Sequence, residues 1–106
     1  MGAVMATAAK IVYPQIVKTP GVRGGKARIE GTRLCVVDVV YRHKAGLTPE
    51  QIRSEYPDLN LAQIHAALAY YYANTGEIEA EIQRDREWEE GFEARKAEYL
   101  ARRAGR

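Results

Sequence analysis

The first third of the chain alternates short β-branched runs with turn residues. Residues 11–18 (IVYPQIVK) are rich in Ile and Val, and Pro14 restricts this run to an edge or broken strand. Residues 19–25 (TPGVRGG) are typical of a turn, and residues 26–30 then alternate polar and apolar positions. The pattern predicts a two-stranded ribbon. Because a lone ribbon is marginal in water, it should pack on another element or pair with a second copy.

The middle of the chain carries the clearest helix signals. In residues 47–52 (LTPEQI), Thr48 is placed as a helix N-cap, with proline at the first helical position and glutamine three residues after the cap. The same device recurs in residues 59–64 (LNLAQI), with Asn60 as the cap and Gln63 completing the box. Apolar residues flank both boxes where a hydrophobic staple forms. The two boxes predict two consecutive helices joined by a short turn.

A further helical pattern precedes these boxes. Residues 36–45 place valines at helical spacing, and Gly46 is a natural helix stop. Together with helices over about residues 49–56 and 61–73, this pattern predicts a tri-helical helix-turn-helix core. The sequence Asn74-Thr75-Gly76 should then interrupt or kink the third helix.

The last thirty residues are rich in strong helix formers. On a helical wheel, six large apolar residues fall within an arc of about 120°, the width of a buried stripe. Asp85, Glu89 and Lys96 share that arc, and Gly91 weakens its middle. So sparse a stripe suits a segment that orders on the surface of a partner. The six candidate partner-binding residues are Ile78, Ile82, Trp88, Phe92, Tyr99 and Leu100.

The expected fold class is therefore mainly α. We expect a disordered N-terminus (1–10), a β-ribbon arm (11–33), a helix-turn-helix domain (34–76) and a partner-binding helical tail (77–106). No run of apolar residues is long enough for a membrane span, so no membrane association is expected. The single cysteine, Cys35, indicates a reducing compartment and a cytoplasmic protein.

Charge is unevenly distributed along the chain, although the net charge is only +2. Residues 18–44 hold seven basic residues against two acidic ones, whereas residues 77–93 hold eight acidic residues against two basic ones. A basic front and an acidic stretch suggest two surfaces with different partners. The alternative is that each charge run is a solvated face.

Four motifs in a fixed order resemble a known family. They are GGKARIEGTR (residues 24–33), AGLTPEQI (45–52), YPDLNL (56–61) and HAALAYYY (65–72). With them, residues 16–82 resemble the domain-of-unknown-function 433 (DUF433) family, whose members are often labelled antitoxins of the Vap type. Many members carry proline where Ala27 and Cys35 stand here. The resemblance implies a homeodomain-like helix-turn-helix domain, commonly encoded beside a toxin with a PIN-like ribonuclease fold.

DNA binding is one hypothesis for the basic front. The recognition helix, residues 61–73, contains no Lys or Arg, which argues against reading of the major groove because phosphate neutralisation supplies much of the affinity. The ribbon and its loops are the better candidates, and the expected DNA-binding residues are Arg23, Lys26, Arg28, Arg33 and Gln63. Alternatively, the arm pairs with its twin and its charges are solvated. Arg33 can instead tie the ribbon to the helices by bonding helix-end carbonyls.

Toxin binding is the hypothesis for the tail. Trp88 and Phe92 lie one helical turn apart inside an acidic rim, which a groove on a basic nuclease would accept. The alternative is that the tail folds back on its own core or pairs with another copy.

The combined prediction is a homodimeric antitoxin that inhibits a PIN-like ribonuclease toxin through its C-terminal helix and represses its own operon by binding operator DNA. The alternatives are a free-standing DNA-binding regulator and an oligomerisation adaptor that binds neither toxin nor DNA. No enzymatic activity, metal or cofactor is expected, because His43 and His65 lie on separate helices without a partner nucleophile or a pair of carboxylates.

Overall fold

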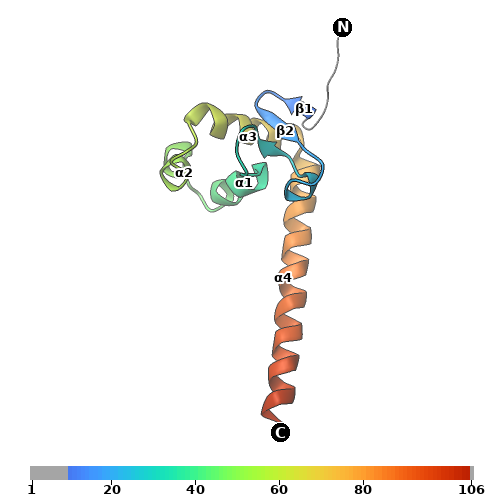
Figure 1. Cartoon of the computed structure of the whole chain (residues 1–106). Helices are drawn as coiled ribbons and strands as arrows, with labels where there is room; N and C mark the ends of the chain where they lie inside the picture. Colours follow the sequence, from blue (N-terminus) through green and yellow to red (C-terminus); the bar gives the residue numbers. More distant parts are fainter. Residues whose placement is uncertain (1–9, 106) are drawn as a thin grey trace. The chain divides into compact units, whose positions relative to one another are not determined.

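The computed structural model describes residues 10–105 of the chain (Figure 1). The expected disordered terminus falls in residues 1–9, outside the described residues, apart from Lys10, which begins the first strand. Contacts divide the chain into two units, with the boundary between Thr75 and Gly76.

An antiparallel sheet opens the first unit. Its strands are β1 (Lys10–Tyr13), β2 (Ile16–Lys18) and β3 (Arg28–Ile29), in the order β1-β2-β3. The sheet at the N-terminus was expected, but the run over residues 11–18 forms two strands. The chain reverses after Pro14, where Gln15 adopts a positive φ of 66°, a conformation that few residues other than glycine take up.

Three helices follow the sheet: α1 (Val36–Lys44), α2 (Pro49–Glu55) and α3 (Leu61–Ala73). Helix α3 contacts α1, α2, β2 and β3, so it forms the centre of the core. The fully buried side chains include Ile16 from β2, Val40 from α1 and Ile64 from α3. The unit is thus a tri-helical helix-turn-helix with a small sheet packed on its third helix.

Both predicted capping boxes are present. The Thr48 backbone N–H donates to Gln51 Oε1 at 2.8 Å, and the Gln51 N–H donates to Thr48 Oγ1 at 3.2 Å. Asn60 and Gln63 make the corresponding pair of bonds, each at 2.8 Å. These bonds satisfy backbone donors that a helix start otherwise leaves open, so the starts of α2 and α3 are set by local sequence.

The second unit is one long helix. Helix α3 ends at Ala73, Asn74 caps it, and α4 (Thr75–Ala104) begins one residue later, so the predicted interruption is confirmed. Helix α4 runs for 30 residues and is the orange-to-red segment of Figure 1. Among the described residues, no helix combines the length and hydropathy of a membrane span.

Candidate functional site

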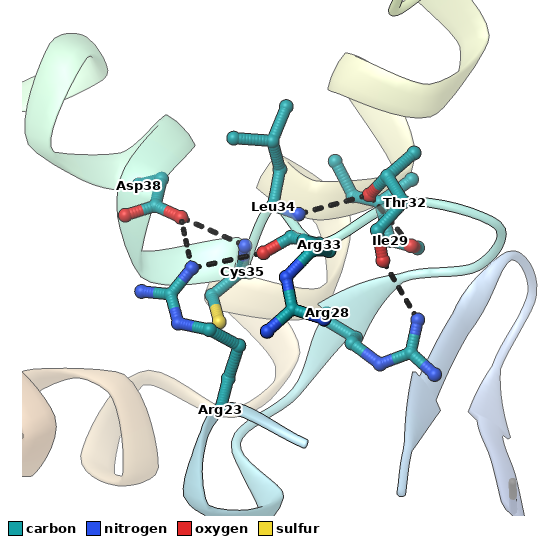
Figure 2. Close-up of polar contacts among 8 residues, drawn as sticks. All are labelled: Arg23, Arg28, Ile29, Thr32, Arg33, Leu34, Cys35 and Asp38. Atoms are coloured by element: carbon teal, nitrogen blue, oxygen red, sulfur yellow. Dashed lines mark hydrogen bonds and ion pairs between the residues drawn. The ribbon is translucent and has the colours of Figure 1, made fainter.

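Arg28, an expected DNA contact, is used inside the fold. Its Nη1 donates to the Thr32 carbonyl at 2.8 Å and its Nη2 donates to Thr19 Oγ1 at 2.7 Å. Thr32 Oγ1 in turn donates to the Ile29 carbonyl and accepts from the Leu34 N–H (Figure 2). Arg28 therefore holds the turn after β3 against the loop after β2. These bonds give it a structural role and make it a weaker candidate for phosphate contact.

Arg23 also makes intramolecular bonds. Its Nη1 donates to the Arg33 carbonyl at 2.9 Å and lies 3.6 Å from Asp38 Oδ2. The same carboxylate oxygen accepts the Cys35 N–H at 2.8 Å and so caps the start of α1 (Figure 2). The tie between the arm and the helices that was considered for Arg33 is thus made by the Arg23 side chain, with Arg33 supplying its backbone carbonyl.

The remaining DNA-binding candidates differ in exposure and in the bonds they make. The Arg33 side chain is exposed, Lys26 is half-buried, and Gln63 uses its side-chain oxygen in the α3 capping box. A bidentate contact to adenine needs both the oxygen and the nitrogen of a glutamine amide, so the cap competes with such a contact. Of the five candidates, Arg23 and Arg33 are exposed, and Arg23 uses one guanidinium nitrogen in the intramolecular contacts described above.

An ion pair links α1 to α2. Arg42 Nε donates to Glu55 Oε1 at 3.0 Å, and the guanidinium lies 5.2 Å from the centre of the Tyr56 ring. The hydrogen bond to Glu55 is the main reason why the pKa of Arg42 is raised. Burial raises the pKa of the Tyr56 phenol, and the charge of Arg42 lowers it in part. Sequence reasoning missed this group, because its members belong to different helices.

The candidate partner-binding surface lies on α4. Trp88 is 64% exposed and Phe92 43% exposed, and their rings stack with centroids 5.5 Å apart and planes 12° apart. Tyr99 and Leu100, each 52% exposed, continue the surface towards the C-terminus. We call these four residues the exposed stripe. Single exposed apolar residues are ordinary, but a stacked aromatic pair continued along one helix resembles a binding surface.

Ile78 and Ile82 do not belong to the exposed stripe. Both are buried within the chain, as is Glu81 between them. The six-residue stripe expected from the helical wheel therefore has two parts, a buried one near the start of α4 and an exposed one from Trp88 onward. A helical wheel shows which residues share a face, but it contains no information on where along the helix that face is covered.

Carboxylates lie close to the aromatic pair along the chain. Four exposed residues flank it in sequence, namely Glu87, Glu89, Glu90 and Glu93. Beyond them the charge reverses, and Arg102 forms an exposed pair with Glu98 at 3.5 Å. In the part of the chain that the structure describes, no cluster of three or more His, Cys, Asp or Glu side chains has the arrangement of a metal site.

These features define a class of protein: a helix-turn-helix domain with a small N-terminal sheet, extended by a long helix with an exposed aromatic stripe. The chain belongs to the DUF433 family, described as "Protein of unknown function (DUF433)", which matches residues 16–71. The resemblance noted from the motifs is thereby confirmed. The matched segment ends within α3, so α4 lies outside it.

A solved structure supports the same assignment. The chain is similar to a DUF433 member protein from Anabaena variabilis ATCC 29413, with 38% sequence identity and a TM-score of 0.61. The likeness covers 65% of this chain and 68% of that chain. No curated protein matches the sequence.

Proposed function

We propose that this protein is the antitoxin of a type II toxin–antitoxin pair and that α4 binds and inhibits a PIN-like ribonuclease in the cytoplasm. The observation that carries the proposal is the stacked Trp88–Phe92 pair, which stays exposed in the free chain. Large aromatic side chains of this kind dominate binding energy when a partner covers them.

Charge favours a nuclease as the partner. A surface that binds RNA is basic, and the carboxylates around Trp88 and Phe92 complement such a surface. Charge complementarity of this kind speeds association and excludes acidic partners.

Inhibition then follows from occlusion. With the aromatic pair bound in a groove at the entrance to the nuclease's active site, α4 sterically excludes RNA. The acidic rim adds repulsion against the phosphates of an incoming RNA. A basic side chain, Arg84 or Arg95, placed near the acids that hold the nuclease's metal would add to the block.

The proposal requires that a neighbouring gene encode a PIN-like ribonuclease. The test is co-expression with the product of that gene, followed by co-purification and an RNA-cleavage assay. The double substitution Trp88→Ala with Phe92→Ala should abolish co-purification and restore cleavage, while the folded chain melts at nearly the same temperature. The matched control is Arg86→Ala with Glu98→Ala, two exposed changes on the same helix outside the acidic rim that leave the net charge unchanged. Equal loss of binding in both variants, or full inhibition by the aromatic double variant, would refute the proposal.

Binding of operator DNA by a homodimer is the second candidate function. It is favoured by the geometry of α2 and α3, which are joined by a short turn as in helix-turn-helix proteins. The charges open to phosphate are those of exposed side chains such as Arg33 and Arg53. Affinity for the upstream DNA should fall steeply with added salt, and Arg33→Ala should reduce that slope. Failure to bind at low salt would remove this function and leave toxin inhibition standing.

A further inference from the structure

We infer that the face of α4 that carries Trp88, Phe92 and Tyr99 is self-complementary and that, in the absence of another partner, two copies of the chain pair through α4 in antiparallel orientation. The inference goes beyond the proposed function, because it names what covers Trp88 and Phe92 when no nuclease is bound. It rests on the order of charged and aromatic residues along one face of the helix.

The face is a heptad seam. From Asp85 to Arg102, residues separated alternately by three and four positions lie on one side of α4 and span about 25 Å of helix. Each is exposed or half-buried in the free chain. In order, the six seam residues are Asp85, Trp88, Phe92, Arg95, Tyr99 and Arg102.

An antiparallel pair brings the first residue of this seam to the last residue of the other copy. Asp85 then faces the partner's Arg102, and the two form an ion pair at each end of the interface. Trp88 faces the partner's Tyr99, which gives an aromatic pair in the next layer.

The central layer is complementary as well. Phe92 faces the partner's Arg95, so a guanidinium can lie over a phenyl ring. At the edge of the seam, Glu89 comes close to the partner's Lys96, which adds an oppositely charged pair. By two-fold symmetry each of these contacts occurs twice in the dimer.

The parallel arrangement is much less favourable. It would place Asp85 against the partner's Asp85, Arg95 against the partner's Arg95 and Arg102 against the partner's Arg102, three layers of like charge. Beyond the seam, the whole helix shows the same polarity, since residues 77–93 are acidic and residues 94–106 are basic. Charge therefore selects the antiparallel orientation.

The Arg102–Glu98 and Arg103–Tyr99 interactions of the free chain are compatible with this pairing. The Arg102–Glu98 pair has side chains about two-thirds exposed, 67% and 69%, so it is readily exchanged. The guanidinium of Arg103 lies 5.8 Å from the Tyr99 ring centre and donates to the Tyr99 hydroxyl at 3.1 Å, which orients that ring. Trp88 and Phe92 stack on each other within the same helix, so the two rings lie together on this face.

Self-pairing and nuclease binding would exclude each other, because both use Trp88 and Phe92. The dimer would then keep the aromatic surface covered until the nuclease binds the monomer. Capture would accordingly depend on the concentration of free chain.

The test uses the full chain without any partner. Sedimentation equilibrium over about 1–100 µM should show a monomer–dimer equilibrium. Asp85→Arg and Arg102→Asp, each alone, should raise the dissociation constant about tenfold or more, because each creates two like-charge contacts per dimer. The double variant, Asp85→Arg with Arg102→Asp, should recover most of the affinity, since it restores opposite charges in the antiparallel register alone.

Trp88 provides a second readout, as it is the single tryptophan of the chain. Its emission should move to shorter wavelength as the concentration rises, with the same midpoint as dimer formation. Far-UV circular dichroism confirms that each variant is still folded.

Three results would overturn the inference. The wild-type chain could stay monomeric, the wild type and all three variants could dimerise with the same dissociation constant, or the double variant could dimerise no more tightly than the single variants. None of these results bears on nuclease binding, which is measured with the nuclease present. Loss of nuclease binding likewise leaves the dimer measurement intact.

Discussion

Helices α3 and α4 have the same secondary structure but differ in how many of their side chains are buried. In its 13 residues, α3 buries five side chains, from Ile64 to Tyr71. The 30 residues of α4 bury three, all before Gln83, and everything after that point is exposed or half-buried. Packing therefore stabilises α3, whereas the outer part of α4 depends on helix propensity and local charge pairs.

The difference separates a packed unit, residues 10–75, which we call the scaffold, from the exposed part of α4, which we propose as a contact surface. A helix that is already packed has few side chains left to offer a partner, and α3 in addition has no Lys or Arg for DNA phosphates. A helix stabilised by interactions within itself leaves its large side chains exposed to solvent, as Trp88 and Phe92 show. The family match stops within α3, so the family assignment rests on the scaffold, whereas the contact surface of α4 is a proposal of its own.

The strongest test of this comparison is a pair of truncations to alanine. Ile64→Ala removes a fully buried side chain at the centre of the core and should lower the free energy of unfolding by about 2–5 kcal/mol, because it leaves a cavity. Trp88→Ala removes a larger but exposed side chain and should change it by less than about 0.5 kcal/mol. Urea denaturation followed by circular dichroism measures both. Similar losses in the two variants would show that α4 is part of the scaffold.

A second test concerns the polar ties of the scaffold. Arg28→Ala removes the bonds to Thr19 and Thr32, and should cost about 2 kcal/mol because charged hydrogen bonds in a partly buried setting are lost. The control is Arg33→Ala, which removes an exposed guanidinium from the neighbouring turn and should be nearly neutral. Thermal melting ranks the two. A neutral Arg28→Ala would return that residue to the set of DNA-binding candidates.

Features set by neighbouring residues were predictable from the sequence. The starts of α2 and α3 follow from Thr48 and Asn60, and the interruption at Asn74 follows from residues adjacent to it. The extra strand was missed, because the reversal at Gln15 requires a positive φ that non-glycine residues rarely adopt. The role of Asp38 was missed too, since cysteine is an unusual N-cap and drew no attention to the residue three positions later.

Features that depend on residues distant in the sequence were harder to predict. The helical wheel placed Ile78 and Trp88 on one stripe, but only the structure shows that the first is buried and the second exposed. The helical wheel placed Asp85, Glu89 and Lys96 in the arc only as interruptions of an apolar stripe. It left out Arg95, which lies between Phe92 and Tyr99, and Arg102, which follows Tyr99, and these two residues complete the seam that we infer.

A smaller effect is expected at the helix starts of the scaffold. Asn60→Ala removes the side-chain acceptor for the Gln63 N–H, which should cost about 1 kcal/mol of stability. Asn60→Ser retains a capping oxygen and should stay close to the wild type in the same denaturation experiment. An Asn60→Ala variant as stable as the wild type would show that packing alone sets the start of α3.

The smallest effect, and the one most specific to α4, is expected at Gly91. Alanine there should favour the helix by about 1 kcal/mol locally, because glycine is a poor helix former. The added Cβ would meet only the tip of the Arg95 side chain at 3.3 Å, a flexible group that can move aside. Helicity at 222 nm should rise and amide exchange in α4 should slow, while the urea midpoint of the scaffold stays unchanged. Ala94→Gly is the matched reverse change and should lower helicity by a similar amount. If the scaffold midpoint moved with either variant, the outer part of α4 would share the stability of the core, and the distinction between scaffold and contact surface would fail.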